Sequence, residues 1–160
     1  MKPVDFATRT GYLETLLTGD NLTGVEVGVD SGAHAASILT YCSIKKLWLV
    51  DPWENSYIEG YCAGRLSKWR NRICMEKGTS NMVVKIFNPS SLDFVYLDQE
   101  HDYNSVNEDL NLWWPKLTHG GIMALRNYNG NEGLKKAADE FKEGKKFEID
   151  SYTNEIIFFR

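Results

Sequence analysis

The sequence predicts an α/β protein with a Rossmann-like fold, a three-layer sandwich in which helices cover both faces of a mostly parallel sheet. Short apolar runs alternate with segments whose apolar residues recur at helical spacing, and two β-rich runs close the chain. This alternation requires right-handed crossovers and parallel strands, whereas the closing pair adds an antiparallel C-terminal hairpin strand. With 160 residues the chain can bury one sizeable core, and we expect a single domain over residues 1–160.

Five short runs rich in β-branched and aromatic residues are predicted as the parallel strands. They cover residues 24–29, 46–51, 73–78, 93–98 and 122–128. The two closing runs cover residues 146–152 and 155–160, and the tight turn between them at Thr153 and Asn154 predicts the hairpin.

Helices are predicted between these strands from the spacing of apolar residues. Their ranges are 5–17, 30–42, part of 52–72, 79–87, 105–117 and 131–144. The segment 105–117 shows the pattern well, because Val106, Leu110 and Trp113 would lie on one side of a helix. We expect the glycine pair that follows, Gly120 and Gly121, to end this helix.

Composition and charge argue against some classes of partner. The formal net charge is −4, with 42% hydrophobic and 25% charged residues, and no overall basic character favours nucleic acid. The three cysteines are odd in number and lack paired metal spacing, which fits a reducing compartment. The start, MKPVDFATRTGY, lacks the apolar run of a signal peptide, and no segment approaches the ~20 apolar residues of a membrane span. We therefore expect a cytoplasmic protein without a membrane partner.

The first predicted strand runs into a glycine turn, VEVGVDSGAHAASIL. Its pattern is E-x-G-x-x-x-G, formed by Glu26, Gly28 and Gly32, with Asp30 in the middle. Glycine lets a ligand lie against the backbone, and the helix that follows offers free N–H groups. Asp51 ends the next strand, about 20 residues further on, where a carboxylate can accept hydrogen bonds from a ribose diol.

The two acids of this turn favour one cofactor over another. A carboxylate repels a pyrophosphate but attracts an ammonium or a sulfonium group. Glu26 and Asp30 therefore favour S-adenosylmethionine, which carries both positive groups, over a dinucleotide. The alternative, in which Gly28 and Gly32 only form a tight turn between strand and helix, stays open at this point.

Three strings resemble the small class I S-adenosylmethionine-dependent methyltransferases: GVEVGVDSGAHAASIL, LWLVDPWE and SLDFVYLDQEHDYNSVNEDLNLWWPKLTHGGIMA. More narrowly, the chain is similar to the branch with a core of the type DFVYIDGDHSYE…DLxxWWPKLKPGGxxxGHDY, which includes sugar O-methyltransferases (methyltransferase domain family 24). The resemblance covers about Gly24 to Tyr128 and implies the fold already predicted, with S-adenosylmethionine as methyl donor. The cofactor-binding residues that it implies are Glu26, Gly28, Val29, Asp30, Gly32, Asp51, Pro52, Trp53, Gly78, Thr79, Ser80 and Asp98.

Methyl transfer to a hydroxyl requires that donor and acceptor are aligned and that the hydroxyl loses its proton. His101, three residues after Asp98 at the end of the fourth strand, is the candidate base, because imidazole titrates near neutral pH. The resemblance implies the same role for this histidine. His34, at the start of the first crossover helix, is expected to border the cofactor or solvent.

Some relatives in this branch also use a divalent cation, so Asp98 and Asn127 are candidate ligands for Mg²⁺. The fifth strand ends in ALRNY, however, where the family often has AGHDY, so that Arg126 stands at the histidine and Asn127 at the acid. In the alternative, Arg126 acts in catalysis by binding a carboxylate or phosphate group on the acceptor.

The leading function is a methyltransferase that acts on a hydroxyl of a small molecule or sugar, with His101, Asp98 and Arg126 as catalytic residues. A second hypothesis is a protein that binds the cofactor but is catalytically degenerate. A third, a nucleotide-binding oxidoreductase, is disfavoured by Glu26 and Asp30. Since the chain has little room for a separate acceptor domain, a homodimer is also compatible with the sequence.

Overall fold

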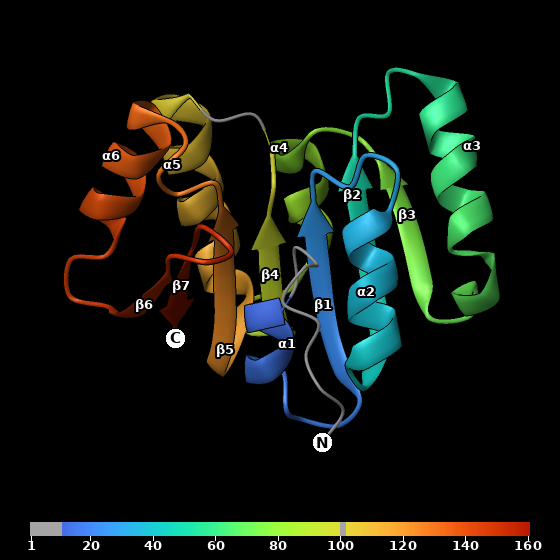
Figure 1. Ribbon diagram of the computed structural model, residues 1–160, viewed down its shortest axis with the longest axis horizontal. Coiled ribbons are helices and arrows are strands. Elements are labelled where there is room, and N and C mark those ends of the chain that lie inside the picture. The colour runs from blue at the N-terminus through green and yellow to red at the C-terminus, as the bar shows by residue number, and fades with distance from the viewer. Residues whose placement is uncertain (1–10, 100–101) are drawn as a thin grey trace.

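The computed structural model describes residues 11–99 and 102–160. Within these residues, a seven-stranded sheet has the strand order β3-β2-β1-β4-β5-β7-β6 (Figure 1). The strands are β1 (Leu22–Val27), β2 (Ile44–Asp51), β3 (Ile73–Lys77), β4 (Leu92–Leu97), β5 (Leu117–Arg126), β6 (Lys146–Asp150) and β7 (Glu155–Phe159). The strands β1 to β5 are parallel, and β7 runs antiparallel to both β5 and β6. The predicted parallel sheet with an antiparallel C-terminal hairpin is therefore confirmed.

Helices cover both faces of this sheet, as the three-layer prediction requires. The helices are α1 (Gly11–Leu16), α2 (Ala33–Tyr41), α3 (Ser56–Arg65), α4 (Ser80–Val83), α5 (Tyr103–Trp113) and α6 (Glu132–Phe141), with 3-10 turns η1 (Ser67–Trp69), η2 (Val84–Ile86) and η3 (Trp114–Lys116). Residues of α1, α2 and α3 pack into one hydrophobic cluster and residues of α4, α5 and α6 into another, on opposite faces (Figure 1).

The central strand β4 shows how one sequence run supplies both faces. Phe94 and Tyr96 pack into the cluster under α2, whereas Val95 and Leu97 pack into the cluster under α5. Successive side chains of a strand point to opposite faces, so a strand covered on both sides is a continuous apolar run. This explains why LDFVYL lacks the alternation of a half-exposed strand.

The prediction for the glycine pair after α5 is wrong. The helix ends at Trp113, before η3, and β5 already begins at Leu117 and runs through Gly120 and Gly121. The ring of Pro115 in η3 leaves no N–H for a continued helical ladder, so the chain turns earlier than the glycines indicate. Gly120, at φ +85°, donates its N–H to the carbonyl oxygen of Arg160, so the pair lies inside the sheet.

Two other expectations concern the ends of the chain. The predicted helix over residues 5–17 falls partly outside the described residues, which contain α1 from Gly11. In the hairpin turn, Asn154 has φ +58° and Thr153 donates its N–H to the Asp150 carboxylate at 2.8 Å. No helix in the described part of the chain is long and apolar enough to span a bilayer; the cytoplasmic location stays a prediction.

Candidate functional site

A cavity of about 820 Å³ opens at the carboxyl ends of β1, β2, β4 and β5. Parallel strands end at the same edge of a sheet, and this edge is where open α/β sheets bind ligands. The residues of the cavity that were predicted from the sequence are Glu26, Gly28, Val29, Asp30, Asp51, Pro52, Trp53, Asp98 and Arg126. His34, Asn55, Ile58 and Gln99 also line it, together with Ser31, Ala33 and Glu54.

Gly28 makes the glycine turn possible because main chain lies directly against it. Its φ is +84°, and a Cβ at this position would lie 2.3 Å from the carbonyl oxygen of Asp98. Gly32 also has a positive φ of +75°, and a Cβ there would lie 2.8 Å from the Cys62 sulfur of α3. Gly28 thus brings β1 close to the end of β4, whereas Gly32 lets α2 begin against α3 and is absent from the cavity lining.

Asp51 holds the two loops of the cavity together. Its Oδ2 accepts from the backbone N–H groups of Val29 and Asp30, both at 2.9 Å, and its Oδ1 accepts from the backbone N–H of Trp53 at 2.7 Å. The Trp53 indole N–H in turn donates to the carbonyl oxygen of Asp30 at 3.0 Å. A carboxylate has about four lone-pair sites. Asp51 therefore retains capacity for a ligand hydroxyl, and its contact with a ribose diol stays a prediction.

Glu26 and His34 form a buried pair at the floor of the cavity. Glu26 is 1% exposed, and its Oε1 lies 3.2 Å from His34 Nδ1, while its Oε2 has no hydrogen-bond partner among the described residues. His34 is 5% exposed and stacks on Tyr96, with ring centroids 3.7 Å apart. Burial raises the pKa of Glu26, and the neighbouring His34 opposes that rise. His34 therefore borders the cavity, as the sequence indicated.

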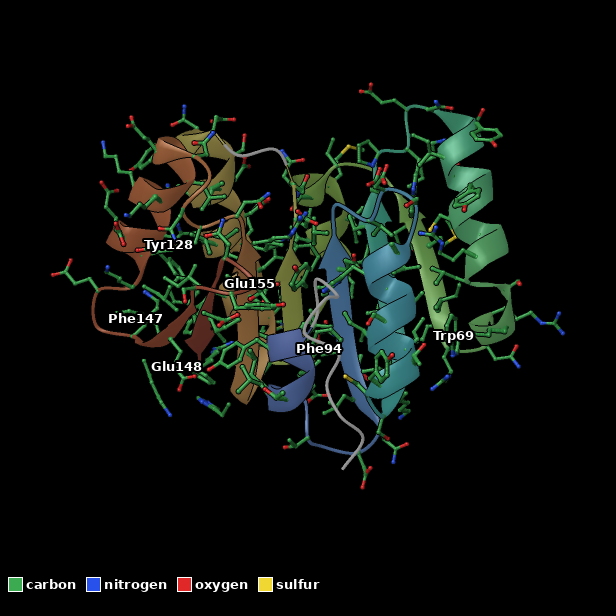
Figure 2. The ribbon with its side chains drawn as sticks, in the orientation of Figure 1. Trp69, Phe94, Tyr128, Phe147, Glu148 and Glu155 are labelled. Carbon is green, nitrogen blue, oxygen red and sulfur yellow. The ribbon has the colours of Figure 1, made fainter. Side chains whose placement is uncertain are left out.

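Behind this pair lies a second buried carboxyl group that the sequence interpretation missed. The Tyr96 hydroxyl donates to Glu155 Oε1 at 2.7 Å, and both side chains are fully buried. Glu155 Oε2 has no partner within the described residues, and burial raises the pKa of Glu155. Glu155 begins β7, where β7 pairs with β5 (Figure 2). Glu155 and Ile157 are two positions apart in β7, so their side chains point to the same face of the sheet. This spacing is the sequence signal that could have placed Glu155 on a buried face.

Asp98 and Arg126 form an ion pair inside the cavity. Arg126 Nη1 lies 3.0 Å from Asp98 Oδ1 and 2.8 Å from Oδ2, and the side chains are 13% and 19% exposed for Asp98 and Arg126. Asp98 directly follows β4 and Arg126 ends β5, so the pairing of these neighbouring strands brings the two groups together.

The predicted Mg²⁺ site has no support in this geometry. Both Asp98 oxygens already accept from Arg126, and no recorded hydrogen bond joins Asn127 to Asp98. Within residues 11–99 and 102–160, no group of three or more His, Cys, Asp or Glu side chains could hold a metal ion. His101, the predicted base, lies outside the described residues.

The loop after β3 is tied to α5 rather than to the cavity. Ser80 donates its hydroxyl to Asp109 Oδ1 at 2.5 Å and accepts from the Trp113 indole N–H at 2.7 Å. Gln99, which lines the cavity, donates its amide N–H to Asp109 Oδ2 at 2.8 Å. Burial raises the pKa of Asp109 to about 6. Gly78, Thr79 and Ser80, predicted at the adenine, are thus absent from the described lining.

A family model described as a methyltransferase domain matches residues 25–128. The chain belongs to this methyltransferase family. The predicted membership among class I S-adenosylmethionine-dependent methyltransferases is therefore confirmed, while the sugar-specific branch stays a prediction. No curated protein sequence matches this methyltransferase.

Solved structures share the fold of this methyltransferase at low sequence identity. A protein from Corynebacterium glutamicum has a TM-score of 0.76 at 15% identity, covering 99% of this chain and 82% of its own. A precorrin-6y C5,15-methyltransferase from Geobacter metallireducens has a TM-score of 0.74 at 15% identity, covering 99% and 90%. A SAM-dependent methyltransferase from Aquifex aeolicus has a TM-score of 0.67 at 11% identity, covering 94% and 87%.

Proposed function

We propose that this methyltransferase transfers the methyl group of S-adenosylmethionine to a hydroxyl of a small molecule. Its sequence resembles a branch that includes sugar O-methyltransferases, so a sugar is the acceptor class that we favour. The observation that carries the proposal is the buried Glu26 at the floor of the cavity. Its Oε2 has no described hydrogen-bond partner, and an unpaired buried carboxylate oxygen is costly. A ligand ammonium group at this oxygen would remove that cost.

The other lining residues also fit this cofactor. Asp51 can accept from one ribose hydroxyl, and the buried Trp53 beside it offers an apolar surface to the adenine. Acidic side chains dominate the lining, and among its described residues Arg126 alone supplies a permanent positive charge. Such a cavity attracts a sulfonium and an ammonium group and repels a pyrophosphate. This supports S-adenosylmethionine over the nicotinamide dinucleotide of an oxidoreductase.

When bound, the cofactor supplies an electrophilic methyl group on a positively charged sulfur. The cavity residues would hold the cofactor so that its methyl group faces the acceptor oxygen, and such positioning can supply ~7–11 kcal/mol of the barrier. The hydroxyl proton must leave as the new bond forms. We assign its removal to His101, because it follows Asp98 by three residues in the chain and its imidazole titrates near neutral pH.

Ligand-dependent thermal unfolding tests the cofactor assignment. S-adenosylmethionine and S-adenosylhomocysteine, each at about 100 times its Kd, should stabilise the protein by about 2.7 kcal/mol, while NAD should not. For a chain of this size the midpoint should rise by roughly 5–10 °C. A shift with NAD and none with either sulfur compound would contradict the proposal.

The catalytic assignment needs a separate measurement. Formation of S-adenosylhomocysteine should be followed with a panel of sugars and other small hydroxyl compounds. His101→Ala should reduce turnover by about 10²–10⁴-fold, the usual contribution of a general base, without changing cofactor affinity. Cofactor binding without turnover across the panel would favour the catalytically degenerate alternative. A homodimer stays a prediction, which light scattering can test.

A further inference from the structure

We infer that Arg126 takes the place of a divalent cation in this methyltransferase, binding Asp98 on one side and the oxygen of a neutral hydroxyl acceptor on the other, so that methyl transfer needs no metal. This inference rests on the proposed function and specifies its acceptor class. It arises from a disagreement, since the resemblance implies a cation at Asp98 and the structure holds an arginine against it.

The position of the guanidinium group is the first argument. A single nitrogen, Arg126 Nη1, lies 2.8 and 3.0 Å from the two oxygens of Asp98, so one donor atom bridges the carboxylate much as a cation would. A divalent ion at the same place would have to displace this nitrogen and then remain beside a permanent positive charge. The neighbouring Asn127 offers a neutral amide instead of a second carboxylate.

The remaining donors of Arg126 supply the second argument. A guanidinium group has five N–H donors, and those on Nη1 bind Asp98. Among the described residues, Nη2 and Nε have no recorded hydrogen bond, and the partly exposed side chain lines the cavity. Donors of this kind can bind an acceptor oxygen and stabilise the negative charge that grows on it as the proton leaves.

Charge balance decides the class of acceptor. Asp98 compensates the charge of Arg126, and the other ionisable carboxyl groups of the lining are Glu26, Asp30, Asp51 and Glu54, with no second arginine or lysine among the described lining residues. The buried Glu155 also stands opposite Arg126 in the β5–β7 ladder. A phosphate or carboxylate on the acceptor would therefore meet an excess of negative charge. The structure therefore favours a neutral polyol as the acceptor. The sequence alone had suggested that Arg126 binds an acceptor with a carboxylate or phosphate group.

The reaction balances without a metal. The acceptor oxygen forms the new C–O bond while the C–S bond breaks, and the electron pair of that bond stays on sulfur as a neutral thioether. The hydroxyl proton goes to His101, and Arg126 remains protonated throughout because its pKa lies far above neutral. Arg126 thus contributes hydrogen bonds and charge, and it exchanges no proton.

Metal binding is the decisive test, with Mn²⁺ as a paramagnetic probe. The wild-type protein should bind no Mn²⁺ in an electron paramagnetic resonance titration, and its turnover should be unaffected by EDTA. The double variant Arg126→His and Asn127→Asp restores the HDY string of the resembled family and should bind one Mn²⁺ per chain. Stoichiometric Mn²⁺ binding by the wild type, with activity lost in EDTA, would overturn the inference.

A conservative variant keeps the inference testable even where the double variant fails to fold. Arg126→Lys retains the charge but loses the planar fork, and it should lower kcat by about 10²–10³-fold, the effect of removing one oxyanion donor. Arg70→Lys, on an exposed arginine absent from the cavity lining, is the matched control and should leave kcat unchanged. An Arg126→Lys variant with wild-type kcat would contradict the role of the fork.

The acceptor class has its own readout. Neutral sugars should be methylated and the corresponding sugar phosphates should not, whereas turnover of the phosphates alone would contradict the charge argument. S-adenosylhomocysteine should stabilise the wild type and the Arg126 variants equally. If S-adenosylhomocysteine stabilises neither the wild type nor the Arg126 variants, the proposed function is refuted. If it stabilises them all but the wild type binds Mn²⁺, only the role of Arg126 is refuted.

Discussion

On the face covered by α5, Asp109 uses both oxygens to accept from Ser80 and Gln99, whereas on the face covered by α2, Glu26 and Glu155 each keep one oxygen without a described partner. Both clusters are buried carboxyl groups at the same end of the same sheet. Satisfied buried polar groups rigidify a structure, and unsatisfied ones in a native protein require another explanation. The difference supports a structural role for the α5 cluster and is consistent with the proposal that Glu26 binds a ligand.

The largest expected effect is the loss of the satisfied cluster. Asp109→Ala leaves Ser80 and Gln99 without their acceptor and should lower the free energy of unfolding by about 3 kcal/mol. Asp109→Asn keeps one acceptor oxygen and should lose roughly half as much. Urea unfolding gives both numbers. A loss for the alanine variant below about 0.5 kcal/mol, the level of ordinary surface substitutions, would break the comparison.

The pH dependence of stability should follow from the same carboxyl group. Burial raises the pKa of Asp109 from 3.8 to about 6, so the folded protein holds this proton more tightly than the unfolded chain. The contribution to stability is complete below about pH 3.8 and is lost as the pH rises to about 6, on the order of 3 kcal/mol.

Urea midpoints of wild type and Asp109→Asn between pH 4 and 7 isolate this contribution, because Glu26 and Glu155 titrate in both proteins. The difference in unfolding free energy between the two proteins should change with pH over this window. A difference that is independent of pH would show that Asp109 stays ionised, with Gln99 and Ser80 offsetting its burial.

For Glu26 the expected effects on stability and binding have opposite signs. Glu26→Gln removes a buried carboxylate and should leave the unfolding free energy unchanged or raise it by up to about 1 kcal/mol. The same change should weaken S-adenosylhomocysteine about 30-fold, or about 2 kcal/mol, because a charge-assisted hydrogen bond is lost. Calorimetry measures the affinity, and Glu143→Gln, on an exposed glutamate absent from the cavity lining, is the matched control. Equal affinity with reduced stability would assign Glu26 to the fold.

The smallest effect is expected behind the cavity. Tyr96→Phe removes the hydroxyl that donates to Glu155 and should cost about 1 kcal/mol of stability. Glu155→Gln in the Tyr96→Phe background should recover part of this loss, since an amide is cheaper to bury than a carboxylate. Thermal unfolding of the single and double variants measures the coupling. No recovery would indicate that Glu155 is already protonated in the native state.

Much of the cavity was predictable from the sequence because parallel strands end together. Glu26, Asp51 and Asp98 each lie at or next to the end of a predicted strand, and the structure places all three in one cavity. The orientation of Ser80 was not predictable, because it depends on Asp109 and on the register of α5 against the sheet. The strand order is enough to bring Arg126 near Asp98. That a single nitrogen, Arg126 Nη1, donates to both carboxylate oxygens of Asp98 could be learned only from the side-chain geometry.

The contact at Gly28 restricts which sequences can build this cavity. The atom nearest to an added Cβ belongs to the main chain of Asp98, so no change of rotamer in a neighbouring side chain could make room for a methyl group. Any replacement must separate the ends of β1 and β4, and with them Glu26 from the Asp98–Arg126 pair. Among homologous chains, position 28 should therefore stay glycine even where the acceptor changes, while the residues at positions 126 and 127 vary with the acceptor.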